Sequence, residues 1–319
     1  MQAREILKQE LHSFNNVLTK EFQSEVTSVH RMMMYLSQAK GKQLRPIFLL
    51  LCARLCGATN DRTYRAAALI EMLHIASLVH DDIVDHSMKR RGAYSANALW
   101  KSRSAVFLGD VLFTKGVLLP LENGDYNTLK IFAKAIEETI EGELVQLSKT
   151  QKLNLDENVY YNIIRQKTAT LLRAACEAGA ATTSEDNNIV QQLATFGENV
   201  GMAFQIKDDL LDYGTDNIGK PIGNDIQERK ITLPLIHVLN KCDNITRRKL
   251  LYIIKHQSTN EKQLQYLKEQ VKELDGFTYA ESKMLEYRNN AMNILYSFAE
   301  TPVRTALEEL VVYITERKY

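Results

Sequence analysis

Apolar residues recur at three- and four-residue steps through most of this 319-residue chain. That spacing places them on one face of an α-helix, and the alternation typical of β-strands is absent. The five prolines fall where helix starts or connections are plausible, not inside strongly periodic segments. We therefore expect long helices, which include positions 65–84, 106–119, 129–147, 157–180, 189–213 and 264–274.

Length and composition limit the architecture further. With 45% hydrophobic residues, the chain can bury the core of one large domain or two small ones. No internal repeat of solenoid type and no low-complexity tract is present. We predict an all-α fold in which residues 1–319 form a single large helical bundle around a central cavity.

The charge balance excludes some classes of partner. The chain has 40 Lys and Arg against 39 Asp and Glu, so its net charge is +1 and no global field favours nucleic acid. The first ten residues contain no signal-peptide apolar region, and the longest apolar run, 47–53, is far shorter than a membrane span. We expect a cytoplasmic protein without a nucleic-acid partner.

Two aspartate-rich boxes, Asp81–Asp85 and Asp208–Asp212, lie inside apolar helical stretches. In a helix, Asp81 stacks on Asp85 and Asp208 on Asp212, so that each box is an acidic stripe. Like charges at this spacing destabilise a helix by ~0.2–0.5 kcal/mol per pair, which favours a bound cation. Mg2+ accepts carboxylate and phosphate oxygens, so the pattern indicates diphosphate chemistry. Alternatively, a single acidic run can be a solvated helix face.

Local basic groups accompany the boxes. Lys89–Gly92 follows the first box at a distance that suits a loop folding back, and Gly41–Pro46 lies at a helix entrance that favours anions. Gln205 precedes the second box by three residues on the same face. A solvated basic turn is the alternative for the first group. Further candidates for phosphate contacts are Lys167, Thr168, Lys220 and Lys230.

With these motifs in order along nearly the whole chain, the sequence resembles the trans-isoprenyl diphosphate synthase family. Both aspartate boxes are intact, and further motifs match at Gly41–Pro46, His74, Arg90–Gly92, Gly142–Gln146, Lys167–Thr168 and Phe204–Gln205. Gln43 is a small departure, because relatives often carry a basic residue there. Without the resemblance, His74 could equally be a core histidine between Leu73 and Ile75.

The resemblance implies a role for each matching residue. Asp81, Asp85 and Asp208 would bind Mg2+, three ions in all when diphosphate is present, on the allylic diphosphate. Asp82, Asp209 and Asp212 would be direct, water-mediated or more distant partners of the metal, and the catalytic set would include Lys167. The allylic diphosphate would contact Arg90, Lys167, Thr168, Gln205 and Lys230, with Lys220 nearby. Isopentenyl diphosphate would contact Lys42, Arg45, His74 and Arg91.

The implied reaction is ionisation, condensation and elimination. The allylic carbon–oxygen bond breaks, the double bond of isopentenyl diphosphate attacks the cation, and a proton leaves. Metal ions and cationic side chains would neutralise the charge that grows on the departing diphosphate, so no protein nucleophile is needed. The released diphosphate would accept the proton.

The helix before the first box can set product length. Ser77 and Ala76 lie ~6–7.5 Å below Asp81, and Met72 and Leu73 lie deeper, at the ~1.5 Å rise per residue of a helix. Relatives that stop at farnesyl length carry a bulky aromatic at the two upper positions. We therefore predict a long product, of heptaprenyl to decaprenyl length, for a quinone side chain. Alternatively, a side chain of another helix closes the tunnel, for which candidates are Phe107, Leu112 and Phe113.

The resemblance also implies partners and rival functions. Relatives are usually homodimers, and some form heterodimers with a dissimilar small subunit, a choice the sequence leaves open. The apolar product would require transient membrane contact for its release. The alternatives are a shorter-chain synthase, a class I terpene cyclase, which would usually lack the second intact box, and a non-catalytic prenyl-diphosphate-binding subunit, which would commonly lack aspartates.

Overall fold

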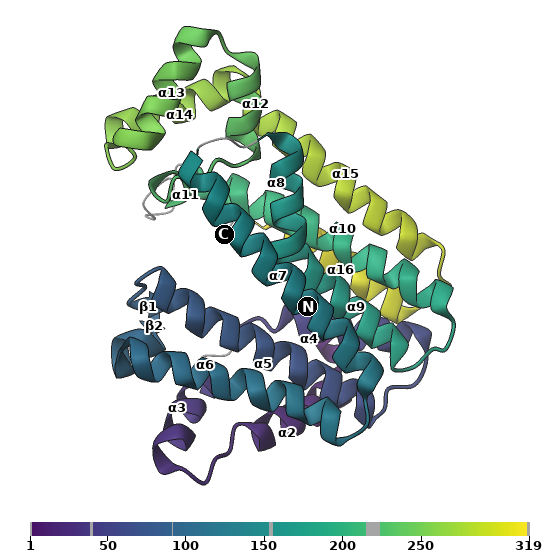
Figure 1. Cartoon of the computed structure of the whole chain (residues 1–319). Coiled ribbons are helices and arrows are strands. Elements are labelled where there is room, and N and C mark those ends of the chain that lie inside the picture. The colour runs from purple at the N-terminus through teal and green to yellow at the C-terminus, as the bar shows by residue number, and fades with distance from the viewer. Residues whose placement is uncertain (1, 39–40, 91, 153–155, 215–223, 318–319) are drawn as a thin grey trace. The chain divides into compact units, whose positions relative to one another are not determined.

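The chain is predominantly helical in a computed structural model that describes residues 2–38, 41–90, 92–152, 156–214 and 224–317 (Figure 1). The all-α prediction is confirmed. Its small exception is a hairpin of two-residue strands, β1 (Lys89–Arg90) and β2 (Ala93–Tyr94), which pair antiparallel directly after the first box.

The helices group into two compact units. Unit 1 contains residues 1–134, 174–194 and 300–307, and unit 2 contains residues 135–173, 195–299 and 308–319. The first aspartate box belongs to unit 1 and the second to unit 2. One domain over residues 1–319 stays a prediction.

Unit 1 is built around α5 (Asp61–Val84), the helix that ends in the first box. The middle of α5 is buried from Ala66 to Leu73, where α4 and α2 pack against it. The other helices that begin within residues 1–134 are α1 (Gln2–Ile6), α2 (Lys8–Glu21), α3 (Thr27–Gln38), α4 (Leu44–Cys56), α6 (Ala96–Glu122) and α7 (Tyr126–Lys152).

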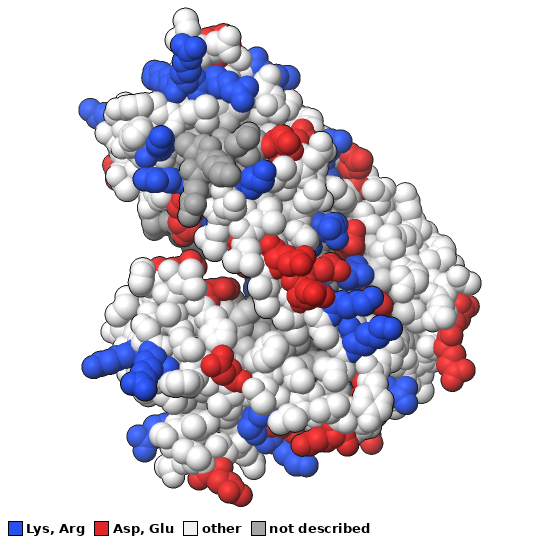
Figure 2. Space-filling view, viewed as in Figure 1, with Lys and Arg blue, Asp and Glu red and all other residues white. Residues whose placement is uncertain are grey.

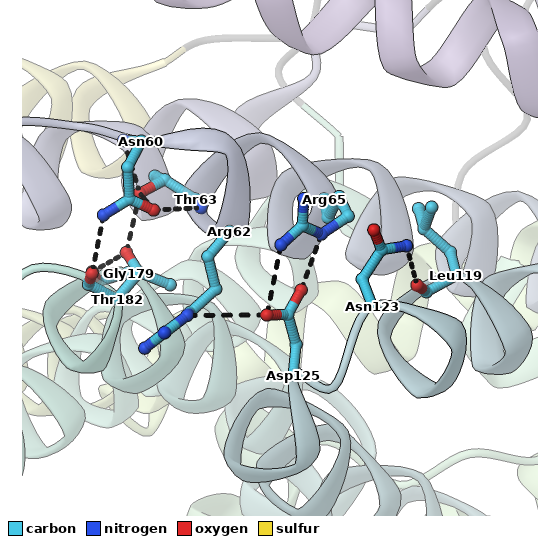
Figure 3. Close-up of polar contacts among 9 residues, drawn as sticks. All are labelled: Asn60, Arg62, Thr63, Arg65, Leu119, Asn123, Asp125, Gly179 and Thr182. Atoms are coloured by element: carbon cyan, nitrogen blue, oxygen red, sulfur yellow. Dashed lines mark hydrogen bonds and ion pairs between the residues drawn. The ribbon is translucent and has the colours of Figure 1, made fainter.

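Polar contacts fix the start of α5 (Figure 3). Asn60 and Thr63 form a reciprocal capping box, and the Asn60 amide also donates to the Thr182 carbonyl at 2.9 Å. One turn further, the Arg65 guanidinium donates to both carboxylate oxygens of Asp125, at 2.6 and 3.2 Å. Because Asp125 is only 7% exposed, this ion pair is well shielded and holds the α6–α7 turn against α5.

Helix α6 packs closely along α5 through two glycines. A Cβ on Gly109 would lie 2.3 Å from the His80 ring, and one on Gly116 would lie 3.3 Å from Leu69. Lys101 interrupts the helical geometry of α6 with a φ of 64°. Pro120 lies inside this helix near its end, contrary to the expectation that prolines avoid periodic segments.

By length and composition, α6 could also cross a membrane. The longest uninterrupted apolar run, 47–53, lies outside this helix and gave no indication of it. One such helix is weak evidence, since the core helices of soluble proteins pass the same test.

Unit 2 is organised around α10 (Asn187–Asp212), the helix that ends in the second box. Before it come α8 (Glu157–Ile164), a π-helical turn η1 (Arg165–Ala169) and α9 (Thr170–Ala181). After it come α11 (Asn224–Gln227), α12 (Leu233–Lys241), α13 (Asn244–His256), α14 (Glu261–Glu273), α15 (Gly276–Tyr296) and α16 (Pro302–Glu316). A hydrophobic cluster that includes Ile206, Leu235 and Leu267 joins α10, α12 and α14.

Two glycines let neighbouring helices approach the π-helical turn. A Cβ on Gly142 of α7 would lie 2.8 Å from the Gln166 Cβ, and one on Gly201 of α10 would lie 2.5 Å from the Ala169 Cα. The close approach at Gly201 therefore depends on the absence of a side chain there. The turn carries Lys167 and Thr168, and π-helical insertions are frequent at functional sites.

Candidate active site

The first aspartate box closes α5. Asp85 caps the helix, and its backbone N–H donates to the Asp81 carbonyl at 2.8 Å. Asp81 and Asp85 are exposed, as a stacked acidic pair requires, whereas Asp82 is only 3% exposed. The box therefore separates into an exposed pair and a buried carboxylate.

The β1–β2 hairpin returns to this box, as the spacing of its basic residues suggested. The Arg90 Nε donates to Asp82 Oδ1 at 2.7 Å, and the Ser87 backbone N–H donates to the Asp82 carbonyl at 2.9 Å. Arg90 thus neutralises the buried member of the box. The predicted diphosphate contact of Arg91 lies outside the described residues.

A cavity of about 440 Å³ lies beside α5 in unit 1. Asp82 and Arg90 line one part of it, and His74, Gly41 and Gln43 line another. His74 therefore lies on the same cavity as two residues of the Gly41–Pro46 motif, although Lys42 and Arg45 do not line it. Lys42 is exposed and Arg45 is partly exposed at the start of α4, where Gln43 has a left-handed φ of 53°.

The proposed length-determining residues lie at different depths on α5. Ala76, Met72 and Leu73 are buried, and Met72 and Leu73 pack near Gly116 of α6. Ser77 is half-buried, and its hydroxyl donates to the His74 carbonyl at 2.9 Å. Among the alternative blocking residues on α6, Leu112 is buried, whereas Phe107 and Phe113 are exposed.

The second box closes α10 in unit 2. Asp209 is 4% exposed and accepts hydrogen bonds from the Tyr160 hydroxyl at 2.6 Å and the Gln205 amide at 2.8 Å. Asp212 accepts from the backbone N–H of Asp225 at 3.0 Å. Asp208 is contacted by the guanidinium of Arg317. Each aspartate of this box therefore has a different kind of neighbour.

Carboxyl groups in and beside the second box raise one another's pKa values. Burial, together with the nearby Asp225 carboxylate, raises the pKa of Asp209 to about 8. Burial and the charge of Asp212 raise the pKa of Asp225 to about 6, and Lys230 and Lys167 oppose that rise. A divalent cation would favour the ionised form of all these groups.

A smaller cavity of about 160 Å³ adjoins this box. Lys167 and Thr168 of the π-helical turn and Gln205 and Asp209 of α10 line it. Asp225 and Lys230 also line this cavity. The Thr168 hydroxyl donates to the Gln205 carbonyl oxygen at 2.7 Å, so Thr168, Gln205 and Asp209 form a hydrogen-bonded chain. Of the residues predicted around the second box, Lys167, Thr168, Gln205, Asp209 and Lys230 line this cavity, whereas Asp208 and Asp212 do not. Lys220 lies outside the described residues.

Both predicted lysines of this cavity already contact carboxylates. The Lys167 Nζ lies 2.8 Å from Glu143 Oε1, and the Lys230 Nζ lies 2.5 Å from Glu228 Oε2. Both ammonium groups are partly exposed, so an anionic ligand can compete with these carboxylates for them.

The sequence did not single out Tyr160, Asp225 or Arg317. Tyr160 lies in an apolar helical segment without a polar pattern, and Arg317 is 109 residues away from its partner. Asp225 had a weak signal, since it follows a glycine-containing connection after the second box.

The described residues contain no group of three or more His, Cys, Asp or Glu side chains arranged to hold a metal ion. The carboxylate oxygens of the boxes nevertheless suit Mg2+, which binds through one or two carboxylates and takes its other ligands from water and phosphate. The donor set fits a metal that is bound together with its substrate.

On the face shown in Figure 2, basic and acidic side chains occur in small groups of each sign. This distribution agrees with the net charge of +1. Positive charge for an anionic ligand is therefore local, as at Lys167 and Lys230.

Known proteins resemble this chain in sequence and in fold. Residues 26–271 match the family model described as polyprenyl synthetase. A heptaprenyl diphosphate synthase component 2 of Geobacillus stearothermophilus is 32% identical over 98% of this chain and 97% of its own length. A decaprenyl diphosphate synthase from Rhodobacter capsulatus has a TM-score of 0.93 at 33% identity, covering 99% of this chain and 98% of its own.

A polyprenyl synthase from Caulobacter crescentus CB15, solved in complex with calcium and isoprenyl diphosphate, has a TM-score of 0.91 at 34% identity. The match covers 100% of this chain and 98% of that one.

Proposed function

The chain belongs to the polyprenyl synthetase family and is a prenyltransferase, and from that premise we propose that it is a long-chain trans-polyprenyl diphosphate synthase. It would condense isopentenyl diphosphate repeatedly, head to tail, onto an allylic diphosphate such as farnesyl diphosphate. The observation that carries this proposal is the cavity beside the second box, which joins cationic, hydroxyl and amide groups to a buried carboxylate.

Asp81 and Asp85 of the first box and Asp208 of the second would hold Mg2+. The Caulobacter relative, solved in complex with calcium and isoprenyl diphosphate, supports the binding of a divalent cation together with a diphosphate. The bound metal supplies charge neutralisation for the departing diphosphate. Asp209 fits a supporting role, because Tyr160 and Gln205 orient it by hydrogen bonds.

The protein's own groups would bind and orient the two substrates. Lys167 and Lys230 would exchange Glu143 and Glu228 for phosphate oxygens of the allylic substrate, with Thr168, Gln205 and Arg90 as further contacts. Lys42, Arg45, His74 and Arg91 would bind isopentenyl diphosphate. Because these donors are positioned before ionisation, they stabilise the leaving group as its charge develops.

Each condensation forms one carbon–carbon bond and breaks the allylic carbon–oxygen bond. The bonding electrons of that carbon–oxygen bond leave with diphosphate, and the isopentenyl double bond supplies the pair for the new bond. A proton then leaves the resulting cation to the released diphosphate, which restores a double bond.

A long product follows from the small residues below the first box. Neither Ala76 nor Ser77 can block a growing prenyl tail, and the relatives of known name include heptaprenyl and decaprenyl synthases. Such a product would serve as a quinone side-chain precursor, and its release would require transient membrane contact of a cytoplasmic protein.

A homodimer is the proposed assembly, although the name of the Geobacillus relative, component 2, also fits a partner subunit. Light scattering of the purified chain, alone and during turnover, would separate these assemblies. Turnover by a chain that is dimeric alone would favour the homodimer, whereas turnover only after addition of cell extract would favour a second subunit.

The test of the function is incubation with Mg2+, farnesyl diphosphate and labelled isopentenyl diphosphate, followed by chromatography. We expect a ladder of linear products that ends between heptaprenyl and decaprenyl length. A ladder that stops at geranylgeranyl length would identify a shorter-chain synthase, a cyclic hydrocarbon would identify a cyclase, and absence of turnover would indicate a binding subunit.

A further inference from the structure

The arginine that follows α16 lies against the second aspartate box. The Arg317 Nη2 donates to Asp208 Oδ1, and the Arg317 Cζ lies 4.3 Å from the centroid of the Phe204 ring. Phe204 and Asp208 are four residues apart on α10, so they present an aromatic face and a carboxylate on the same side of the helix. Together they form a seat for a planar cation.

Arg317 is held in this seat by its surroundings. Its side chain is only 16% exposed. Val311 and Ile314 are buried on the last turns of α16, and Glu316 pairs with Arg288 of α15 at 3.5 Å. The end of α16 is therefore anchored independently of Asp208, which places the guanidinium there by packing as well as by charge.

The contact involves the aspartate of the second box that the proposed function assigns to metal. Asp209 and Asp212 have neutral donors as neighbours, whereas Asp208 already has a cation on one oxygen. A second cation approaching the same carboxylate is repelled by the guanidinium and finds that oxygen occupied. Since arginine stays protonated at any working pH, protonation changes cannot relieve this competition.

We propose that Arg317 is an internal counter-ion of the second box, which competes with the divalent cation for Asp208. Metal loading then displaces the guanidinium from Asp208 and so couples occupancy of the box to the contact made by the end of α16. This inference rests on the proposed function, because it requires Asp208 to be a metal ligand.

The test is titration of the metal-free protein with Mn2+ in the absence of diphosphate, with free Mn2+ measured by electron paramagnetic resonance. Arg317→Gln should bind Mn2+ about three- to fivefold more tightly, the scale of a partly exposed ion pair. Arg317→Lys keeps the charge and should stay closer to the unchanged protein. Arg288→Gln is the matched control, because it removes an equal charge beside α16 without touching the box, and its affinity should change by less than about twofold.

Asp208→Asn distinguishes a failure of the counter-ion role of Arg317 from a failure of the assignment of Asp208 as a metal ligand. If Asp208→Asn weakens Mn2+ binding but Arg317→Gln leaves it unchanged or weaker, the counter-ion role is overturned and the metal assignment survives. If Asp208→Asn does not weaken binding, both are overturned. Circular dichroism checks that each variant folds. If Arg317→Gln does not fold, Phe204→Leu takes its place, because it removes the aromatic ring under the guanidinium. For the inference to stand, Phe204→Leu must also tighten Mn2+ binding, by a smaller factor.

Discussion

The two aspartate boxes share one sequence pattern, but the second of the three aspartates has different hydrogen-bond partners in each box. In the first box, buried Asp82 is paired with a cation, Arg90, at 2.7 Å. In the second, buried Asp209 receives hydrogen bonds from two neutral groups, Tyr160 and Gln205. Burial and the Asp225 carboxylate raise the pKa of Asp209 to about 8, although these two hydrogen bonds oppose the rise.

This difference teaches that a motif fixes where carboxylates stand along a helix but not how their charge is balanced. The first box carries its own cation on the adjoining hairpin. The second box has its cationic neighbours on distant segments, where Lys167 and Arg317 lie on η1 and after α16. The second box should therefore respond more strongly to added cations.

The largest expected effect tests whether the exposed aspartates of the two boxes are equivalent. Asp81→Ala and Asp208→Ala should each lower kcat by roughly 10²–10³-fold, since each removes charge stabilisation from the leaving group. Steady-state kinetics with farnesyl diphosphate gives the ratio. Asp61→Ala, at the exposed start of α5, is the control and should stay within about twofold. Retained activity in only one box variant would show that the boxes are unequal.

The next test asks whether the first-box helix alone controls product length. Ser77→Phe should shorten the longest product while the first condensation continues, because the half-buried Ser77 position can accept a ring. Product chromatography gives the outcome, with Ser77→Ala as the control that leaves the ladder unchanged. Identical product ladders for the Phe and Ala variants would refute the control of product length by α5.

Removing a hydrogen-bond partner of Asp82 or of Asp209 should lower the free energy of unfolding by different amounts in the two boxes. Arg90→Gln leaves Asp82 buried without its cation and should lower the free energy of unfolding by about 1–3 kcal/mol. Tyr160→Phe removes one neutral hydrogen bond and should cost about 1 kcal/mol. Urea unfolding of the metal-free protein, followed by circular dichroism, compares the two variants. A larger loss for Tyr160→Phe would contradict the comparison.

The smallest effects are expected when the middle aspartates themselves are changed. Asp82→Asn unpairs Arg90 and should destabilise the metal-free protein by about 1–2 kcal/mol. Asp209→Asn replaces a buried carboxyl whose pKa is already raised to about 8 and whose hydrogen-bond donors are neutral, so the change should stay within about 1 kcal/mol in either direction. Equal losses in the same urea assay would mean that the two carboxylates are balanced alike.

Much of the fold could be predicted because helical periodicity is local. The predicted segments 65–84, 189–213 and 264–274 correspond to α5 (Asp61–Val84), α10 (Asn187–Asp212) and α14 (Glu261–Glu273). The backbone N–H of Asp85, the C-cap of α5, still donates to the Asp81 carbonyl at 2.8 Å, so the helical hydrogen bond across the first box is present. By contrast, the segment 157–180 was predicted as one regular helix, and the π-helical turn inside it was missed.

The candidate site could be predicted only where its residues lie within known motifs. The Thr168–Gln205–Asp209 chain joins two such motifs, and its members were all singled out beforehand. Tyr160 and Arg317 were missed because their contacts depend on packing between distant segments, which one sequence does not reveal. The partner of Arg90 was likewise unpredictable, although the return of its loop was expected.

The π-helical turn has an implication for how such a site can arise or be lost. A turn with wider hydrogen-bond spacing corresponds to a single codon inserted into an ordinary helix. Deleting one residue from positions 165–169 would rotate the preceding segment, Tyr160 included, by about 100° relative to α9. One short genetic event could therefore dismantle the contact between Tyr160 and Asp209 while leaving the helical scaffold intact.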